Sequence, residues 1–234
     1  MNRQQRYVLA YDLGTSGVKG ALVDFYGEVV STATASYPLY IPKPNWAEQD
    51  PLQYWEQVCV VTHEVLKNSH VHDSHIEGIA FGTQWKGIIP IDKRGNVLNN
   101  SIIWLDARAA DQAERMNKHF GERMFATADY WPKLMWLQDN RPECVNAAEW
   151  ILEANSFLKW KATGEVAVYI SNSFTRSFDE EIDDLYQDIL NFIGIPRSKF
   201  PRVVHSTEVV GYVTEAAAEQ LGIRSGIPVF GGNS

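Results

Sequence analysis

The chain has 234 residues, 45% of them hydrophobic and 12% aromatic, which is enough for a sizeable buried core and excludes a disordered chain. The formal net charge of −8 argues against a nucleic-acid partner or an anionic membrane surface, because both require clustered Lys and Arg side chains. The N-terminal apolar run is short and is interrupted by Asp12, so it predicts neither a signal peptide nor a spanning helix, and we expect a cytoplasmic protein.

The first predicted elements are three strands joined by tight turns, which form an antiparallel meander. They cover residues 7–14, 18–24 and 28–36. A proline-rich connection, 37–46, cannot hold a regular ladder. A helix follows over 49–67, with Asp50 as its N-cap and Pro51 at its first position. Its predicted buried stripe contains Leu52, Trp55, Cys59 and residues 62–66.

Strands and helices alternate in the rest of the chain, which predicts an α/β class with a mixed sheet and one core. The predicted strands are 75–82, a hairpin over 88–98 that turns at Arg94 and Gly95, 101–108 and a last strand within 226–234. The predicted helices cover 108–120, 133–140, 151–164 and 183–194, the last two ending at glycines. In such sheets ligands bind at the strand ends.

The stretch DLGTSGVK, residues 12–19, places an acid, two glycines and two hydroxyls at the end of the first strand. Backbone N–H groups in such a turn converge on an anion, and Thr15 and Ser16 add side-chain donors, so the turn is typical of a phosphate cradle. Asp12 would repel a phosphate unless Mg²⁺ lies between them. The structural alternative is a plain hairpin turn, and the spacing alone does not separate the two.

The chain resembles the N-terminal domain of the FGGY family of carbohydrate kinases, and most closely its xylulokinase-like branch. Four stretches carry the resemblance: DLGTSGVKGALVD, NWAEQDPLQYW, WLDAR and PVFGG. They occur in order along nearly the whole chain. The first also occurs across the wider actin, hexokinase and Hsp70 superfamily, whereas the four together are specific.

The resemblance implies a ribonuclease-H-like domain, of the actin and hexokinase type, with a mixed sheet flanked by helices. Residues 1–234 would form the sugar-binding half, and ATP and Mg²⁺ would bind between it and a similar C-terminal domain that is absent from this chain. Asp12 would hold the metal, and Gly14, Thr15, Ser16 and Lys19 would handle the ATP phosphates. The family's general-base Asp is expected immediately after Ser234, so no catalytic base is expected within these residues and this fragment alone is expected to be inactive.

The TQWKG turn, residues 83–87, matches a sugar-contacting turn of the xylulokinase-like branch. The match assigns Gln84 to a sugar hydroxyl, but Trp85 and Lys86 replace the usual Met-His pair. Trp85 could stack on a sugar face and Lys86 could donate to hydroxyls, or they could be a core Trp beside a solvated Lys.

The WLDAR stretch matches the family's Trp-x-Asp-x-Arg pattern and predicts Trp104, Asp106 and Arg108 as sugar contacts. An Asp and an Arg two apart in an extended segment face the same side, and the structural alternative is an ion pair that orders the next helix. Neutral residues replace charged ones elsewhere, at Asn155-Ser156 and at Asn172, which leaves the identity of the sugar open.

The sequence therefore predicts one half of an ATP-dependent ketose kinase, with a pentulose such as xylulose as substrate. A kinase of another polyol, such as glycerol or erythritol, remains an alternative, as do an actin- or Hsp70-like ATPase switch and a sugar-sensing pseudokinase. The expected partners are a small sugar, ATP and the second domain of the same enzyme. A homodimer is left open.

Overall fold

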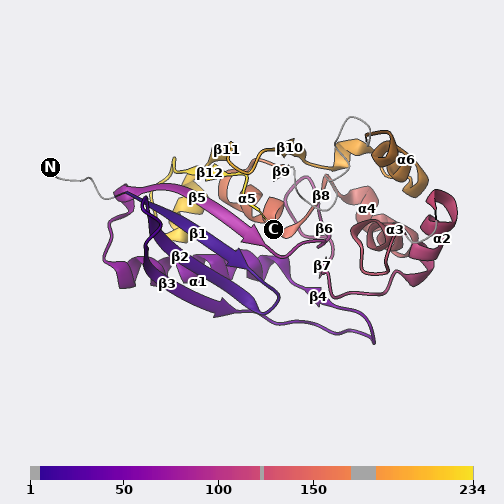
Figure 1. The fold of residues 1–234 in the computed structure, drawn as a ribbon, viewed down its shortest axis with the longest axis horizontal. Helices are drawn as coiled ribbons and strands as arrows, with labels where there is room; N and C mark the ends of the chain where they lie inside the picture. Colours follow the sequence, from indigo (N-terminus) through magenta and orange to yellow (C-terminus); the bar gives the residue numbers. More distant parts are fainter. Residues whose placement is uncertain (1–5, 122–123, 170–182, 234) are drawn as a thin grey trace.

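The computed structural model describes residues 6–121, 124–169 and 183–233. Its largest element is a six-stranded mixed sheet with the order β11-β12-β5-β1-β2-β3 (Figure 1). β1 runs antiparallel to β2 and parallel to β5, and β12 runs parallel to β5. The strands are β1 Tyr7–Leu13, β2 Gly17–Asp24, β3 Val29–Ser36, β5 Ile76–Thr83, β11 Val209–Tyr212 and β12 Pro228–Phe230. The predicted meander and the predicted mixed sheet are confirmed.

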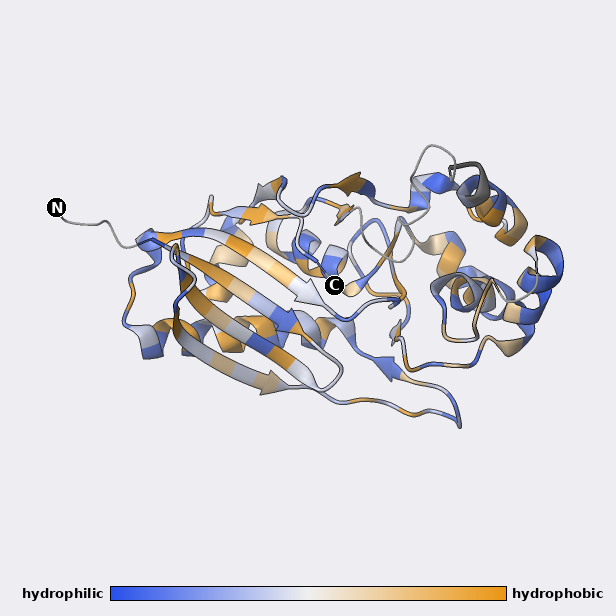
Figure 2. Ribbon diagram, in the orientation of Figure 1, coloured by the Kyte–Doolittle hydropathy of each residue, from blue (hydrophilic) through white to orange (hydrophobic). Residues whose placement is uncertain are grey.

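The two faces of the sheet differ in burial because side chains alternate along each strand. On β1, Tyr7, Leu9 and Tyr11 are buried against the helices, whereas Asp12 is exposed on the opposite face. In Figure 2 both β1 and β2 carry hydrophobic stretches that hydrophilic residues interrupt. Asp12 and Lys19 are direct cross-strand partners, so both lie on the face that the helices leave uncovered.

The covered face packs against α1 Pro51–Ser69, α5 Ala154–Thr163 and α7 Glu215–Leu221. The side chain of Asp50 accepts the Leu52 N–H at 2.9 Å and Pro51 opens α1, as predicted. Leu52 itself is 52% exposed, so its predicted place in the buried stripe is wrong. The buried stripe is made by Tyr54, Trp55, Val58, Val61, Thr62 and Val65.

A second, mostly helical region adjoins the sheet, at the right of Figure 1. It contains α2 Ala110–Phe120, α3 Tyr130–Asn140, α4 Pro142–Ala147 and α6 Asp183–Ile193. Buried hydrophobic side chains form two main clusters, one beneath the sheet and one among these helices, so the expectation of a single core is wrong. Within the described ranges, no helix has the length and apolar character that crossing a membrane requires.

The described residues also contain three short strand pairs outside the large sheet and two 3₁₀ turns. The pairs are β4 Glu48–Gln49 with β7 Ser101–Ile102, β6 Ile89–Ile91 with β8 Trp150–Leu152, and β9 Ala167–Tyr169 with β10 Arg202–Val204. The 3₁₀ turns are η1 Asp73–His75 and η3 Arg197–Lys199.

A predicted strand and a predicted helix are shorter than expected. The strand ends early because the chain turns, and the helix starts late because the residues before it pair with another strand. The strand over 101–108 ends at Ile102, where the chain turns and the Asp106 N–H donates to the Ile103 carbonyl at 3.1 Å. Residues 150–152 form strand β8 against β6, so α5 starts only at Ala154, although it ends before Gly164 as predicted.

Candidate functional site

The predicted phosphate turn closes the β1–β2 hairpin at the edge of the uncovered sheet face. The Gly14 N–H donates to the Gly17 carbonyl at 2.9 Å, and a Cβ on Gly17 would lie 2.2 Å from the Ala35 carbonyl oxygen, so only glycine fits there. Asp12, residues 14–19 and residues 34–36 line an open hollow of about 380 Å³. The structure thus brings together all five predicted phosphate-handling residues.

Two side chains hold the backbone of this turn by hydrogen bonds. The Tyr37 hydroxyl donates to the Gly14 carbonyl and, at 3.2 Å, to the Gly17 carbonyl. Burial raises the pKa of Tyr37 well above its usual value, and Asp12 adds to the effect, so this hydroxyl keeps its proton. The Gln49 amide donates to the Thr15 carbonyl at 2.7 Å.

Trp104 contacts the phosphate turn, although the resemblance implied that it contacts the sugar. Its indole Nε1–H lies 2.9 Å from the Thr15 Oγ1. An indole nitrogen only donates, so the Thr15 hydroxyl accepts this bond and its own proton is available to a phosphate oxygen. Trp104 is 39% exposed and therefore lies at the surface, beside the hollow.

The turn after β5 forms part of a separate pocket of about 260 Å³. The pocket is lined by Trp85, Lys86, Met124, Phe125, Asp129, Tyr130 and Trp131. Lys86 has a left-handed backbone (φ 59°), and its Nζ lies 2.6 Å from the Asp129 carboxylate and 4.4 Å from the centre of the Trp85 ring. The pocket therefore offers a donor, an acceptor and an aromatic face, the groups that recognise a polyol.

Asp129 was not predicted from the sequence. It stands directly before α3, at the N-cap position, but its side chain caps no N–H of the helix. Its second carboxylate oxygen instead accepts the Ala126 N–H of the preceding turn at 2.7 Å. That position is the only signal the sequence carries, and it does not indicate a pairing with Lys86, which lies 43 residues earlier.

The Gln84 side chain is turned away from this pocket and toward the phosphate turn. Its Nε2 donates to the Gln49 Oε1 at 2.6 Å and lies 3.3 Å from the Tyr54 hydroxyl. Its backbone N–H donates to the Leu13 carbonyl at 2.7 Å. A contact between Gln84 and a sugar stays a prediction, and the geometry directs its side chain toward Gln49, which contacts the phosphate turn.

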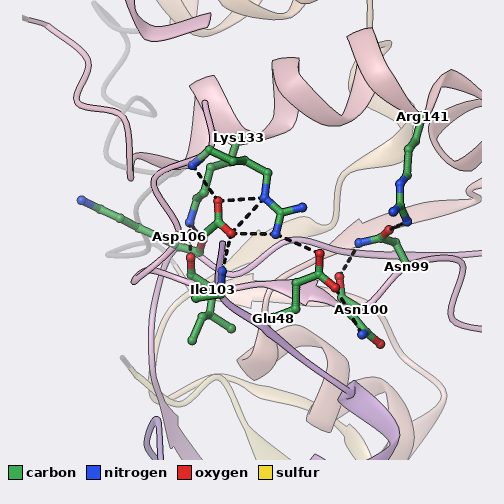
Figure 3. A network of polar contacts seen from close by, with 10 residues as sticks. Glu48, Asn99, Asn100, Ile103, Asp106, Lys133 and Arg141 are labelled. Atoms are coloured by element: carbon green, nitrogen blue, oxygen red, sulfur yellow. Dashed lines mark hydrogen bonds and ion pairs between the residues drawn. The ribbon is translucent and has the colours of Figure 1, made fainter. Parts of the chain in front are cut away.

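Asp106 and Arg108 form a fully buried ion pair. Figure 3 shows Asp106 in a network of polar contacts that also includes Glu48 and Lys133. The guanidinium donates to both Asp106 oxygens at 2.7–2.9 Å and to Glu48 at 2.8 Å, and the Ala47 N–H donates to Asp106 at 2.6 Å. The Arg108 plane lies 3.8 Å from the centre of the Trp46 ring. The geometry agrees with the alternative given above, an ion pair that orders the start of the next helix. A sugar contact by either residue stays a prediction that this burial does not support.

Lys133 on α3 is a buried lysine that links two predicted substrate turns. Its Nζ donates to the Lys86 carbonyl at 2.6 Å and to the Ile103 carbonyl at 2.8 Å. Burial lowers the pKa of Lys133 to about 7, against the attraction of Asp106. The signal in the sequence is a lone lysine within the otherwise apolar or aromatic run YWPKLMWL.

The end of β12 lies beside the start of the TQWKG turn, residues 83–87. Asn233 forms a parallel bridge with Gly82, and its carbonyl accepts the Thr83 N–H at 3.1 Å. Asn155 is fully buried and donates to the Phe81 carbonyl at 2.7 Å, so this departure from the family pattern joins β5 and β12 and does not line the pocket. Asn172 and Ser234 lie outside the described residues.

The hollow fits ATP phosphates and a magnesium ion by the chemistry of its donors. Mg²⁺ in proteins is commonly held by one or two carboxylates together with substrate phosphates and waters, and Asp12 supplies one exposed carboxylate at the rim. Thr15, Ser16 and the glycine turn supply the phosphate donors.

Comparison with known proteins decides the family. The family model described as the FGGY family of carbohydrate kinases, N-terminal domain, matches residues 7–234. The chain belongs to this family. The resemblance drawn from the four sequence motifs is therefore confirmed.

Relatives of the FGGY chain include both predicted substrate classes. A xylulose kinase of Staphylococcus epidermidis is 29% identical over 230 residues, covering 96% of this chain and 46% of that protein. A glycerol kinase of Thermococcus gammatolerans is 30% identical over 239 residues, covering 97% and 48%. The crystal structure of xylulose kinase from Rhodospirillum rubrum superimposes with a TM-score of 0.87 at 26% identity, covering 97% and 49%. The chain spans about half the length of the curated relatives it matches.

Proposed function

We propose that this chain is the N-terminal, sugar-binding half of an ATP-dependent ketose kinase that phosphorylates a pentulose. The observation that carries the proposal is the juxtaposition of two turns: a phosphate turn at 14–17 and a sugar turn at 83–87, joined by hydrogen bonds through Gln49. An ATPase switch would need the first turn and has no use for the polyol pocket beside the second.

Each group has a defined part in the proposed reaction. Thr15, Ser16 and the Gly14 turn position the phosphates, and Asp12 would hold Mg²⁺. When bound, that ion would neutralise charge on the transferring phosphoryl group. Lys86 donates to the sugar, Asp129 accepts from it, and Trp85 covers one of its faces. Asp106 is saturated by Arg108 and the Ala47 N–H, so it is not the proton acceptor.

The proposed proton acceptor is the Asp that the family places after the segment matching 228–234. Asn233 lies against Thr83, so a residue that follows it closely would lie near the sugar turn. We further propose that a second, similar domain of the same enzyme closes the ATP site over the uncovered sheet face.

The pocket favours a neutral polyol over an acidic one. The charge of Lys86 is balanced by Asp129 at 2.6 Å, so a carboxylated or phosphorylated sugar would meet a carboxylate as well as a cation. The two relatives reported above are a xylulose kinase and a glycerol kinase, and both of these substrates are neutral polyols. The exposed face of Trp85 suits a sugar better than the smaller glycerol.

The test is sugar-dependent ADP release by the intact protein, meaning the enzyme with its proposed second domain. The assay contains ATP, Mg²⁺ and a panel of pentuloses, glycerol, erythritol and gluconate. We expect a pentulose to give the highest kcat/KM. Asp12→Asn should lower kcat at least ~100-fold, because the metal clamp acts on charge in the transition state. Asp24→Asn, at the opposite end of β2, is the matched control and should leave kcat nearly unchanged. Absence of turnover with every sugar, or a normal kcat for Asp12→Asn, would contradict the proposal.

A further inference from the structure

A buried side-chain amide bridges the phosphate turn and the sugar turn, which follow the paired strands β1 and β5. Gln49 is fully buried, its Nε2 donates to the Thr15 carbonyl at 2.7 Å, and its Oε1 accepts from the Gln84 Nε2 at 2.6 Å. The Tyr54 hydroxyl donates to the same oxygen at 2.8 Å. Two turns that lie about 70 residues apart in the sequence thus share one side chain.

The position of this amide is fixed by its backbone and by its bonds. Gln49 pairs with Ser101 in the β4–β7 ladder, and the next residue, Asp50, caps α1. A carbonyl oxygen accepts two hydrogen bonds along its two lone pairs, and both are used here. The amide group therefore has one orientation, and it transmits that orientation to both turns.

We propose that Gln49 is a positioning residue for phosphoryl transfer, which holds the phosphate turn at a fixed place relative to the sugar turn. This inference rests on the proposed kinase function. Gln49 does not touch either substrate, because its side chain is fully buried behind Thr15 and Gln84. Its effect arises because in-line transfer depends on how well the two bound substrates are aligned.

Thr15 is held at two points, and only the one on its backbone involves Gln49. The Trp104 indole holds the Thr15 side chain at 2.9 Å, while Gln49 holds the Thr15 backbone. Loss of Gln49 leaves the turn held by Trp104 and Tyr37, and leaves the backbone bond from Gln84 to Leu13 just before the turn. It removes the link between the Thr15 carbonyl and the Gln84 side chain, so the turn would persist with its position relative to the sugar altered.

The test compares Gln49→Met with Tyr54→Phe in the intact protein. The first removes the bridge between the turns, and the second removes a buried hydrogen bond to the same oxygen but leaves the bridge in place. We expect Gln49→Met to lower kcat ~10- to 100-fold with both KM values within ~3-fold, as for a small misalignment of reacting groups. Tyr54→Phe should change kcat less than ~3-fold.

Two further readouts separate positioning from loss of folded protein. The ratio of ATP hydrolysis by water to sugar phosphorylation does not depend on the folded fraction, and we expect it to rise in Gln49→Met only. Hydrogen exchange of the peptide covering 13–18 should become faster in Gln49→Met and not in Tyr54→Phe.

Equal effects of the two variants on that ratio and on exchange would overturn the proposal, and so would unchanged exchange in Gln49→Met. If no sugar is phosphorylated by the wild-type protein, the proposed function fails on its own. The exchange measurement then still decides whether Gln49 fixes the phosphate turn.

Discussion

Asp106 and Arg108 illustrate how a motif that suggests a substrate site can be part of the interior. Both side chains are fully buried, and the guanidinium is held by Asp106, by Glu48 and by the Trp46 ring. Removing Asp106 leaves the buried guanidinium with Glu48 as its remaining carboxylate partner and leaves the Ala47 N–H without its acceptor. Breaking a buried pair in this way costs far more than the pair contributes. Within the WLDAR stretch, Asp106 and Arg108 thus belong to the protein interior, whereas Trp104 lies at the surface.

Asp106→Ala should therefore lower the free energy of unfolding by ~3–5 kcal/mol, measured by urea denaturation. Glu77→Ala is the control, since its ion pair with Arg6 is 36–49% exposed and should contribute at most ~1 kcal/mol. A variant Asp106→Ala with normal unfolding and weaker sugar binding would instead restore the direct contact implied by the resemblance.

At the scale of elements, α3 is unusual because a lysine lies within its buried face. Lys133 donates to two carbonyl groups, one in the sugar turn and one in the turn after β7. A neutral amine has two N–H donors, so both carbonyls remain satisfied when Lys133 loses its proton. This agrees with a pKa lowered to about 7 by burial.

The stability of the protein should consequently rise with pH above neutrality. The pKa of Lys133 is about 7 in the folded state against an ordinary value of 10.5, so between these values the unfolded chain binds the additional proton. The free energy of unfolding then increases with pH across that window and falls as the pH drops through it toward 7. Lys159 contributes in the same direction, because burial lowers its pKa to about 7.

The measurement is urea unfolding of wild type and Lys133→Met at pH 7 and pH 9. We expect the gain in stability from pH 7 to pH 9 to be smaller in the variant, which retains only the Lys159 contribution. An identical gain in both proteins would show that Lys133 stays charged throughout.

The elements that the sequence predicted well are those with a long, regular hydrophobic period. The β1–β3 meander, α1 and β5 are 7 to 19 residues long. Burial alternates along β1 and most of β2, and it recurs every three or four residues along α1. Strands of two or three residues, such as β8 and β9, carry no period and form because a partner strand lies beside them. The helices α4 and α7 were missed because six or seven residues give too little pattern.

The candidate site divides in the same way. The residues of the phosphate turn could be predicted because they adjoin each other in the chain and end a recognisable strand. Gln49, Asp129 and Lys133 could not, since each acts through a partner brought close by the tertiary fold. The sugar contact predicted for Trp104 stays a prediction, and its hydrogen bond to Thr15, which spans 89 residues, could not be predicted from the sequence.

For the whole molecule, the arrangement of the site on the sheet determines what residues 1–234 can do by themselves. The phosphate hollow opens on the sheet face that the helices leave uncovered, with Asp12, Ser16 and Lys19 exposed to water. Charges in such a position interact weakly, because water screens them and because nothing holds the phosphates in line with a sugar.

A polypeptide of residues 1–234 should therefore fold and yet show no sugar-dependent ADP release. Folding is expected because two hydrophobic clusters pack the sheet and the helical region, and circular dichroism with a cooperative thermal transition would check it. The preorganised, water-excluded cleft on which transition-state stabilisation depends would be missing without the proposed second domain. Turnover near the ~1–100 s⁻¹ typical of kinases would show instead that the proton acceptor and a closed phosphate site both lie within these residues.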